Sequence, residues 1–107
     1  MASAERKIGP IADKVIFENE RVRIWELRLA PGQKGPVHRH HLDHILIQID
    51  GDRVAVHPEK ETQGPYAEYL EADATPGNTI YVTRGGLEAA HNIGEREYHE
   101  IIVELKD

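Results

Sequence analysis

The sequence predicts an all-β fold, because its apolar segments are short and are separated by regular turn signals. These segments are rich in β-branched and aromatic residues, the turn signals recur about every ten residues, and no segment keeps a helical period. Many short strands at such a spacing are typical of a β-sandwich or a β-barrel. The length of 107 residues fits one domain, so residues 1–107 are expected to form a single unit.

The first third of the chain carries two predicted strands. Residues 15–17 form the first strand, which ends at the polar turn Glu18-Asn19-Glu20. Residues 22–29 form the second strand, which ends at Ala30-Pro31-Gly32, where Pro and Gly favour a turn. Residues 1–12 are expected to be a flexible or edge segment.

Five more strands are predicted from runs of β-branched and aromatic residues in the rest of the chain. They cover residues 44–49, 53–57, 66–70, 79–83 and 98–105. Turn signals separate them, such as Asp50-Gly51-Asp52 between the first two. In the last segment apolar and acidic residues alternate, with the exception of Ile102, which fits a sheet with one face in the core and the other partly covered.

Composition and charge narrow the range of partners. The chain has 13 Lys and Arg against 19 Asp and Glu, a net charge of −6, and no run of basic residues. These features argue against binding to nucleic acid or to a membrane surface, so a small molecule is the expected partner. The absence of Cys excludes disulfides and thiolate metal sites. The sequence has no signal-peptide pattern and no apolar run near the roughly 20 residues of a membrane span, so a cytoplasmic location is expected.

Four of the seven histidines lie between positions 38 and 44. Pro36 and the β-branched run after His44 oppose a helix in this segment. In an extended segment side chains alternate, so His38 and His40 share one face and His41 points the other way. Two imidazoles on a rigid strand form a chelate for Zn, Fe, Ni, Cu or Mn.

Two patterns in the chain resemble the two motifs of the cupin superfamily. The first motif, G-x5-H-x-H-x3,4-E-x6-G, is matched at every spacing by Gly32, His38, His40, His44 and Gly51. The second motif, G-x5-P-x-G-x2-H-x3-N, is matched in spacing by Gly77, Thr83, Gly85, Glu88 and Asn92. His44 stands where the family usually has its ligand Glu, Thr83 replaces the Pro, and Glu88 stands where the family has its ligand His.

The resemblance implies a single-domain cupin barrel, a jelly roll or double-stranded β-helix, that holds one metal ion. Cupins typically use three His and one Glu, and the exchanged positions preserve this set. The implied ligands of one divalent transition metal, Fe, Mn, Ni or Zn, are therefore His38, His40, His44 and Glu88. His91 is the alternative fourth ligand, although a regular strand would point it away from the side of Glu88. The chain is similar to small stand-alone bacterial cupins.

The cupin resemblance does not specify a reaction, because the superfamily hosts many. We expect a metal-dependent enzyme, either a Lewis-acid isomerase or lyase or an O2-using dioxygenase, that acts on a small carboxylate- or carbonyl-bearing metabolite. A non-catalytic small-ligand-binding or sensor cupin is the alternative. A homodimer is expected for a barrel with exposed strands. The arginines that can bind a carboxylate, or form surface ion pairs instead, are Arg23, Arg28 and Arg84.

Three polar residues are candidates for the surroundings of the metal. Gln48 shares a strand face with His44, so it should point into the barrel and bind substrate or a metal-bound water, or satisfy a backbone group. Asp43 is expected to accept a hydrogen bond from a ligand imidazole or to cap a turn. Tyr81 is expected to donate a hydrogen bond near the metal or to lie at the edge of the core.

Overall fold

Antiparallel strands account for all the regular structure in residues 8–107, which are the residues that the computed structural model describes. The strands are β1 (Lys14–Glu18), β2 (Val22–Leu29), β3 (His38–Arg39), β4 (His44–Asp50), β5 (Arg53–Pro58), β6 (Leu70–Asp73), β7 (Thr79–Val82), β8 (Leu87–Asn92) and β9 (Tyr98–Leu105). The predicted all-β class is confirmed. Within this part of the chain, no helix has the length and apolar character that a bilayer crossing requires.

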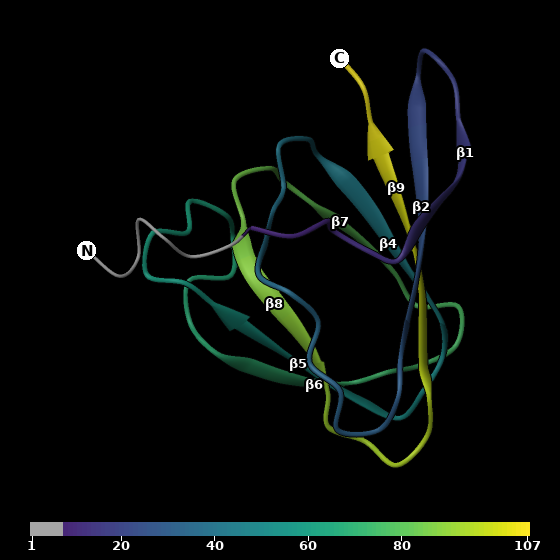
Figure 1. The fold of residues 1–107 in the computed structure, drawn as a ribbon, viewed down its shortest axis with the longest axis vertical. Coiled ribbons are helices and arrows are strands. Elements are labelled where there is room, and N and C mark those ends of the chain that lie inside the picture. The colour runs from purple at the N-terminus through teal and green to yellow at the C-terminus, as the bar shows by residue number, and fades with distance from the viewer. Residues whose placement is uncertain (1–7) are drawn as a thin grey trace.

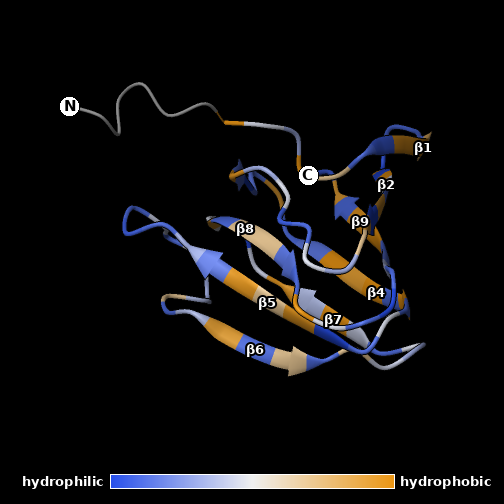
Figure 2. Cartoon of the chain, turned by 60° about the horizontal axis from the view of Figure 1, so that its bottom comes forward, coloured by the Kyte–Doolittle hydropathy of each residue, from blue (hydrophilic) through white to orange (hydrophobic). Residues whose placement is uncertain are grey.

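The strands form two sheets that enclose a common interior. One sheet has the order β1-β2-β9-β4-β7 and the other has the order β3-β8-β5-β6. Figure 1 shows the first sheet on one side of the molecule and β8, β5 and β6 on the other. Polar and apolar residues alternate along β6, as Figure 2 shows, because one face of its sheet points to the interior and the other points to solvent.

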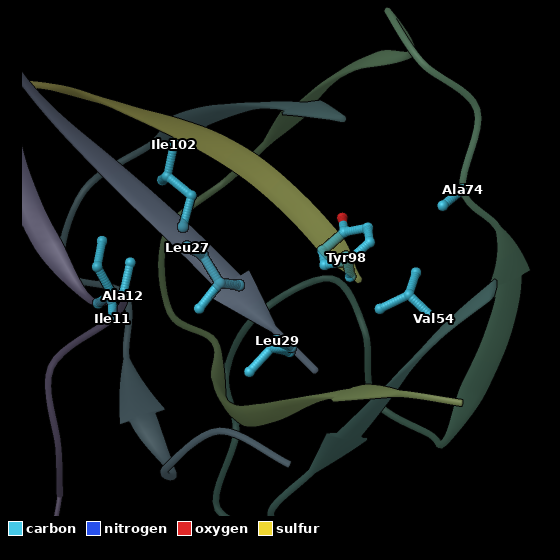
Figure 3. Packing of buried hydrophobic residues seen from close by; sticks show 8 residues of the cluster. All are labelled: Ile11, Ala12, Leu27, Leu29, Val54, Ala74, Tyr98 and Ile102. Carbon is cyan, nitrogen blue, oxygen red and sulfur yellow. The ribbon is translucent and has the colours of Figure 1, made fainter. Parts of the chain in front are cut away.

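A hydrophobic core fills one part of the space between the sheets. Its buried members come from β2, β5, β9 and two loops (Figure 3), and they are Ile11, Ala12, Leu27, Leu29, Val54, Ala74, Tyr98 and Ile102. Trp25, Leu46 and Ala90 pack against this cluster. Of the expected N-terminal segment, residues 1–7 lie outside the described residues, whereas Ile11 and Ala12 are buried within the core.

The strand predictions failed in one region and missed one strand. Residues 66–69 are a loop, and the strand there begins only at Leu70. The missed strand is β8, whereas β3 lies in the histidine segment that was expected to be extended. The sequence of β8, Leu-Glu-Ala-Ala-His-Asn, has no β-branched residue, yet it forms a strand because it pairs with β3 on one side and with β5 on the other.

Candidate functional site

The pairing of β3 with β8 brings the two cupin-like motifs together. His38 on β3 lies directly opposite Glu88 on β8 in the antiparallel register, so their side chains share the inner face of the sheet. His40 follows two residues after His38 and continues this pairing, because its N–H donates to the carbonyl of Gly86 at 2.8 Å and its carbonyl accepts from the N–H of Gly85 at 2.9 Å. Residues 50 positions apart in sequence thereby become neighbours.

Three buried side chains converge at this point. Ligand atoms of His38, His40 and Glu88 lie within 4.8 Å of one another. The Nε2 atoms of the two histidines are 3.1 Å apart, and Nε2 of His40 is 3.6 Å from Oε2 of Glu88. Two ligand atoms at about 2.1 Å from one ion and roughly 90–110° apart are separated by about 3.0–3.4 Å, so the histidine pair fits a shared ion. These three residues can hold a metal ion.

Backbone carbonyls select the histidine tautomers. Nδ1 of His38 lies 3.1 Å from the carbonyl oxygen of Pro36. Nδ1 of His44 lies 3.0 Å from the carbonyl oxygen of Leu42. A carbonyl only accepts, so each Nδ1 carries the proton and each Nε2 keeps its lone pair. An imidazole that donates its other N–H in this way is the usual form of a metal ligand.

Burial keeps these imidazoles neutral. Desolvation, followed by the neighbouring His40, lowers the pKa of His38 to about 4. The pKa of His44 is lowered for the same two reasons, in the same order. Nδ1 of His40 has no hydrogen-bond partner among the described residues, so this ring is held by its Nε2 end alone. A cation at this point would bind neutral nitrogens and the Glu88 carboxylate without first displacing protons from His38.

His44 is buried next to the three converging residues but does not join them. Its ring stacks on that of His40, with centroids 4.0 Å apart and planes 17° apart. Its side chain comes from β4, on the opposite sheet from His38 and Glu88. Three of the four expected ligands are thus brought together in residues 8–107, and the fourth lies against one of them.

His91, the alternative fourth ligand, points away from this centre. Its Nδ1 atom is 3.0 Å from Nε2 of His57, a neighbour on the adjacent strand β5, and it does not line the cavity that His38, His40 and Glu88 border. The separation of three residues from Glu88 places it on the other face of β8, as strand alternation requires.

Two glycines make room for the converging side chains. Gly85 has a φ of +109°, and a Cβ there would lie 2.7 Å from the carbonyl oxygen of Gln63. A Cβ on Gly86 would lie 3.0 Å from Oε1 of Glu88 and 3.4 Å from the ring of His40. The Gly-Gly pair therefore lets the loop before β6 pack against Gly85 and leaves space at Gly86 for the side chains of His40 and Glu88.

A cavity of about 170 Å³ opens beside this centre, and His38, His40 and Glu88 line it. Most of its wall is aliphatic, contributed by both sheets. Its other polar or aromatic members are Gln48, Tyr66, Tyr98 and Glu100. An apolar cavity of about 150 Å³ accepts benzene, so this one has room for a single ring. No Lys or Arg of residues 8–107 lines it, so the positive charge for an anionic ligand has to come from elsewhere.

Glu100 is a cavity residue that the sequence reasoning did not identify. On β9 the alternation buries Tyr98, Glu100, Ile102 and Glu104 and leaves Ile101 and Val103 half-buried. Burial raises the pKa of the Glu100 carboxyl to about 7, although the Tyr98 hydroxyl and His40 lower it. The sequence contained a signal for this, because Glu100 and Glu104 each lie two residues from Ile102 and therefore share its buried strand face.

The other expected polar residues are distributed between the cavity and the surface. Gln48 lines the cavity, as expected from its strand face, but its amide oxygen accepts hydrogen bonds from the backbone N–H of Thr75 and from Asn78. Tyr81 is 58% exposed and donates to Asp43. Asp43 also accepts from Arg84, and neither Asp43 nor Tyr81 lines the cavity.

The three candidate arginines form ion pairs outside the cavity. Arg23 pairs with Glu104, at 2.7 Å, and Arg28 pairs with Glu97, at 2.9 Å. Arg84 pairs with Asp107 at 3.0 Å and, as described above, with Asp43. None of these arginines lines the cavity, and Arg28 and Arg84 form surface ion pairs, whereas Arg23 pairs with the buried Glu104.

Comparison with known proteins identifies the family. A sequence profile described as auxin binding protein matches residues 7–106. The chain belongs to the auxin-binding protein family. It is 24% identical over 94 residues to auxin-binding protein T85 of Nicotiana tabacum, which covers 87% of this chain and 50% of that protein. It is 22% identical over 93 residues to auxin-binding protein 1 of Arabidopsis thaliana, covering 87% and 46%. The chain therefore spans about half the length of the curated relatives it matches.

Solved structures of the same fold confirm the cupin architecture of this family member. A cupin domain from Bordetella pertussis Tohama I has a TM-score of 0.74 and 23% identity, over 88% of this chain and 91% of that one. A double-stranded β-helix protein from Klebsiella pneumoniae has a TM-score of 0.66 and 16% identity, over 98% and 86%. The cupin resemblance and the jelly-roll class predicted from sequence are confirmed.

Proposed function

We propose that this auxin-binding family member binds a small, mostly apolar acid through a metal ion. The observation that carries the proposal is that His38, His40 and Glu88 line one apolar cavity without Lys or Arg. The metal would supply the positive charge that holds a carboxylate or polarises a carbonyl. The protein side chains would position the ion and exclude water from the apolar part of the ligand.

One divalent transition metal, Fe, Mn, Ni or Zn, suits the proposed ligand set. Imidazole nitrogen and carboxylate oxygen accept each of these ions. We assign His38, His40 and Glu88 as ligands, with His44 as the fourth once its ring leaves the stack on His40. The pairing of His91 with His57 argues against its use as the fourth ligand.

The test is metal-dependent binding of a single-ring acid. Untagged protein is analysed for metal, and phenylacetate and the auxin indole-3-acetate are then titrated into metal-loaded and metal-stripped protein by calorimetry. We expect binding only to the loaded protein, and tighter binding of the single-ring acid, because the cavity of about 170 Å³ is close to that of a one-ring site. Equal binding after metal removal, or less than about a tenth of an equivalent of metal, would contradict the proposal.

A metal-dependent enzyme is the second candidate, favoured by one observation. Three candidate ligands converge among residues 8–107, and catalytic metal sites keep a position open for water or substrate. Screening of bound acids for chemical change, with and without O2, separates the candidates. Turnover that disappears in His40→Ala, while the fold is retained, would support the enzyme over the binding protein.

We also propose that the protein forms a homodimer through β1. This strand is an edge of the larger sheet, and all its side chains are exposed, including Val15, Ile16 and Phe17. Pairing with the same edge of a second copy would cover them. Light scattering should show a dimer that Phe17→Asp dissociates. Tyr81→Ser, at the opposite edge of the sheet, should leave the dimer intact, and a monomeric wild-type protein would contradict this proposal.

A further inference from the structure

A directed chain of hydrogen bonds begins at the backbone of Thr75. The N–H of Thr75 donates to Oε1 of Gln48 at 3.0 Å, and the side-chain amide of Asn78 donates to the same oxygen at 3.2 Å. A backbone N–H can only donate, so the orientation of the Gln48 amide is fixed. Its NH2 group must therefore point away from Thr75.

This chain of hydrogen bonds continues from Gln48 through Tyr98 to Glu100. Nε2 of Gln48 donates to the hydroxyl oxygen of Tyr98 at 3.3 Å. Tyr98 has a single hydroxyl proton, and its hydroxyl makes a short hydrogen bond with Oε1 of Glu100. Because the oxygen of Tyr98 already accepts from Gln48, its proton is directed to Glu100. Every donor in this chain is oriented so that Glu100 is the final acceptor.

The second carboxyl oxygen of Glu100 is left for the contents of the cavity. Oε1 receives Tyr98, whereas Oε2 has no hydrogen bond with any residue from 8 to 107. Glu100 is buried and lines the same cavity as the metal centre. Oε2 is not among the solvent-inaccessible side-chain atoms that lack a partner, so it is open to the cavity and can accept a hydrogen bond from a ligand that brings a donor.

We propose that Glu100 is a specificity residue that selects acids carrying a second polar group, an N–H or O–H donor, on the ring. This inference rests on the proposed function, because the metal end of the cavity is assumed to hold the acid group. The cavity would then offer one ligand two polar contacts, the metal ion for its acid group and Glu100 for its donor. The donor would hydrogen-bond to Oε2 of Glu100, in a charge-assisted contact.

The electrostatics of the cavity support this role. Burial and the nearby carboxylate of Glu88 raise the pKa of Glu100 to about 7, although the Tyr98 hydroxyl and His40 lower it. Tyr66 also lines the cavity, and burial and the charges of Glu88 and Glu100 raise its pKa, so it remains a neutral group there.

The experiment compares phenylacetate with its three hydroxyphenylacetate isomers on metal-loaded protein at about pH 8. We expect at least one isomer to bind about tenfold tighter than phenylacetate, since hydrogen bonds to charged groups exceed neutral ones. In Glu100→Gln, the new amide must turn its oxygen to the Tyr98 proton and its NH2 to the cavity, so the ligand hydroxyl could only accept a neutral hydrogen bond there and the preference should weaken. Metal content should be unchanged.

Two further variants keep the test decisive. Glu104→Gln is the matched control, because Glu104 is buried on the same face of β9 but accepts from Arg23 and Trp25 and does not line the cavity. It should retain the hydroxyl preference. If Glu100→Gln does not fold, Glu100→Leu removes the acceptor with a side chain that suits the apolar wall, and it should also lose the preference.

The outcomes separate this inference from the proposed function. If phenylacetate binds through the metal but no hydroxyl isomer binds better, the role of Glu100 is overturned and the proposed function stands. A preference that survives unchanged in Glu100→Gln or in Glu100→Leu overturns it as well. If no acid of the series binds to metal-loaded protein, both proposals fail together.

Discussion

At the scale of single residues, hydrogen bonds to the backbone determine which atoms are available for chemistry. The carbonyls of Pro36 and Leu42 hold protons on Nδ1 of His38 and His44 and leave each Nε2 as a lone pair. The N–H of Thr75 orients Gln48 and, through Tyr98, makes Glu100 an acceptor. The backbone cannot reverse its donors and acceptors, so both polar parts of the cavity have a fixed hydrogen-bonding direction.

The first prediction at this scale concerns metal binding by His40. His40→Ala should remove a central ligand and lower metal affinity by more than about 100-fold, because loss of groups that merely orient ligands already costs about 10–100-fold. Metal titration monitored by calorimetry measures the effect. His41→Ala is the control, because His41 is an exposed neighbour in the same segment and should bind metal as the wild type does. Equal affinities in the two variants would exclude His40 as a ligand.

The second prediction concerns Glu100 and the pH dependence of stability in metal-free protein. The pKa of Glu100 is about 7 in the fold against 4.5 for an ordinary Glu, so the folded state binds more protons between these values. The free energy of unfolding should therefore fall as pH rises from 4.5 to about 7, by roughly 2 kcal/mol. Glu100→Gln should lack this decline.

Urea denaturation of both proteins across this pH range provides the measurement. His38 acts in the opposite direction, because its pKa of about 4 lies below the ordinary 6.5 and its contribution to stability is lost as pH falls. His38 is present in both proteins, so its effect cancels in their difference. A difference that does not change with pH would show that Glu100 titrates as an exposed carboxyl does.

At the scale of elements, short strands and loops position the site. β3 has only two residues, but its register with β8 places His38 against Glu88. The strand patterns could not predict β8, because alanine and glutamate have low strand propensity and pairing on both sides overrides it. They placed a strand at 66–70, whereas residues 66–69 form a loop that brings Tyr66 to the cavity and the strand begins at Leu70.

The loop contact at Gly85 leads to a prediction about stability. Gly85→Ala forces an unfavourable positive φ and also places a Cβ 2.7 Å from the carbonyl oxygen of Gln63. Gly77→Ala is the matched control, because Gly77 also has a positive φ, +88°, but has no atom within 4 Å of the added Cβ. Gly85→Ala should destabilise the protein by about 1–3 kcal/mol more than Gly77→Ala, as measured by urea denaturation. Equal decreases in the free energy of unfolding of the two variants would mean that the loop at Gln63 can move away from the added Cβ.

At the scale of the whole molecule, a metal ion bound by His38, His40 and Glu88 would connect the two motifs and should stabilise the fold. A metal at about 100 times its dissociation constant contributes about 2.7 kcal/mol if it binds only the folded state. We expect thermal unfolding to shift upward with metal in the wild type and not in Glu88→Gln. His91→Ala should keep the shift, because His91 faces His57. Loss of the metal-induced shift in His91→Ala would show that His91 is a ligand.

Local spacing in the sequence was enough to predict the all-β class and the shared face of His38 and His40, because strand alternation depends only on neighbouring residues. The resemblance to the cupin motifs implied the cupin fold and Glu88 as a ligand. Strand pairing and burial, which only the three-dimensional structure shows, separated His91 from the converging side chains, stacked His44 on His40 and placed Glu100 in the cavity. Contacts across sheets depend on strand register and packing rather than on sequence separation.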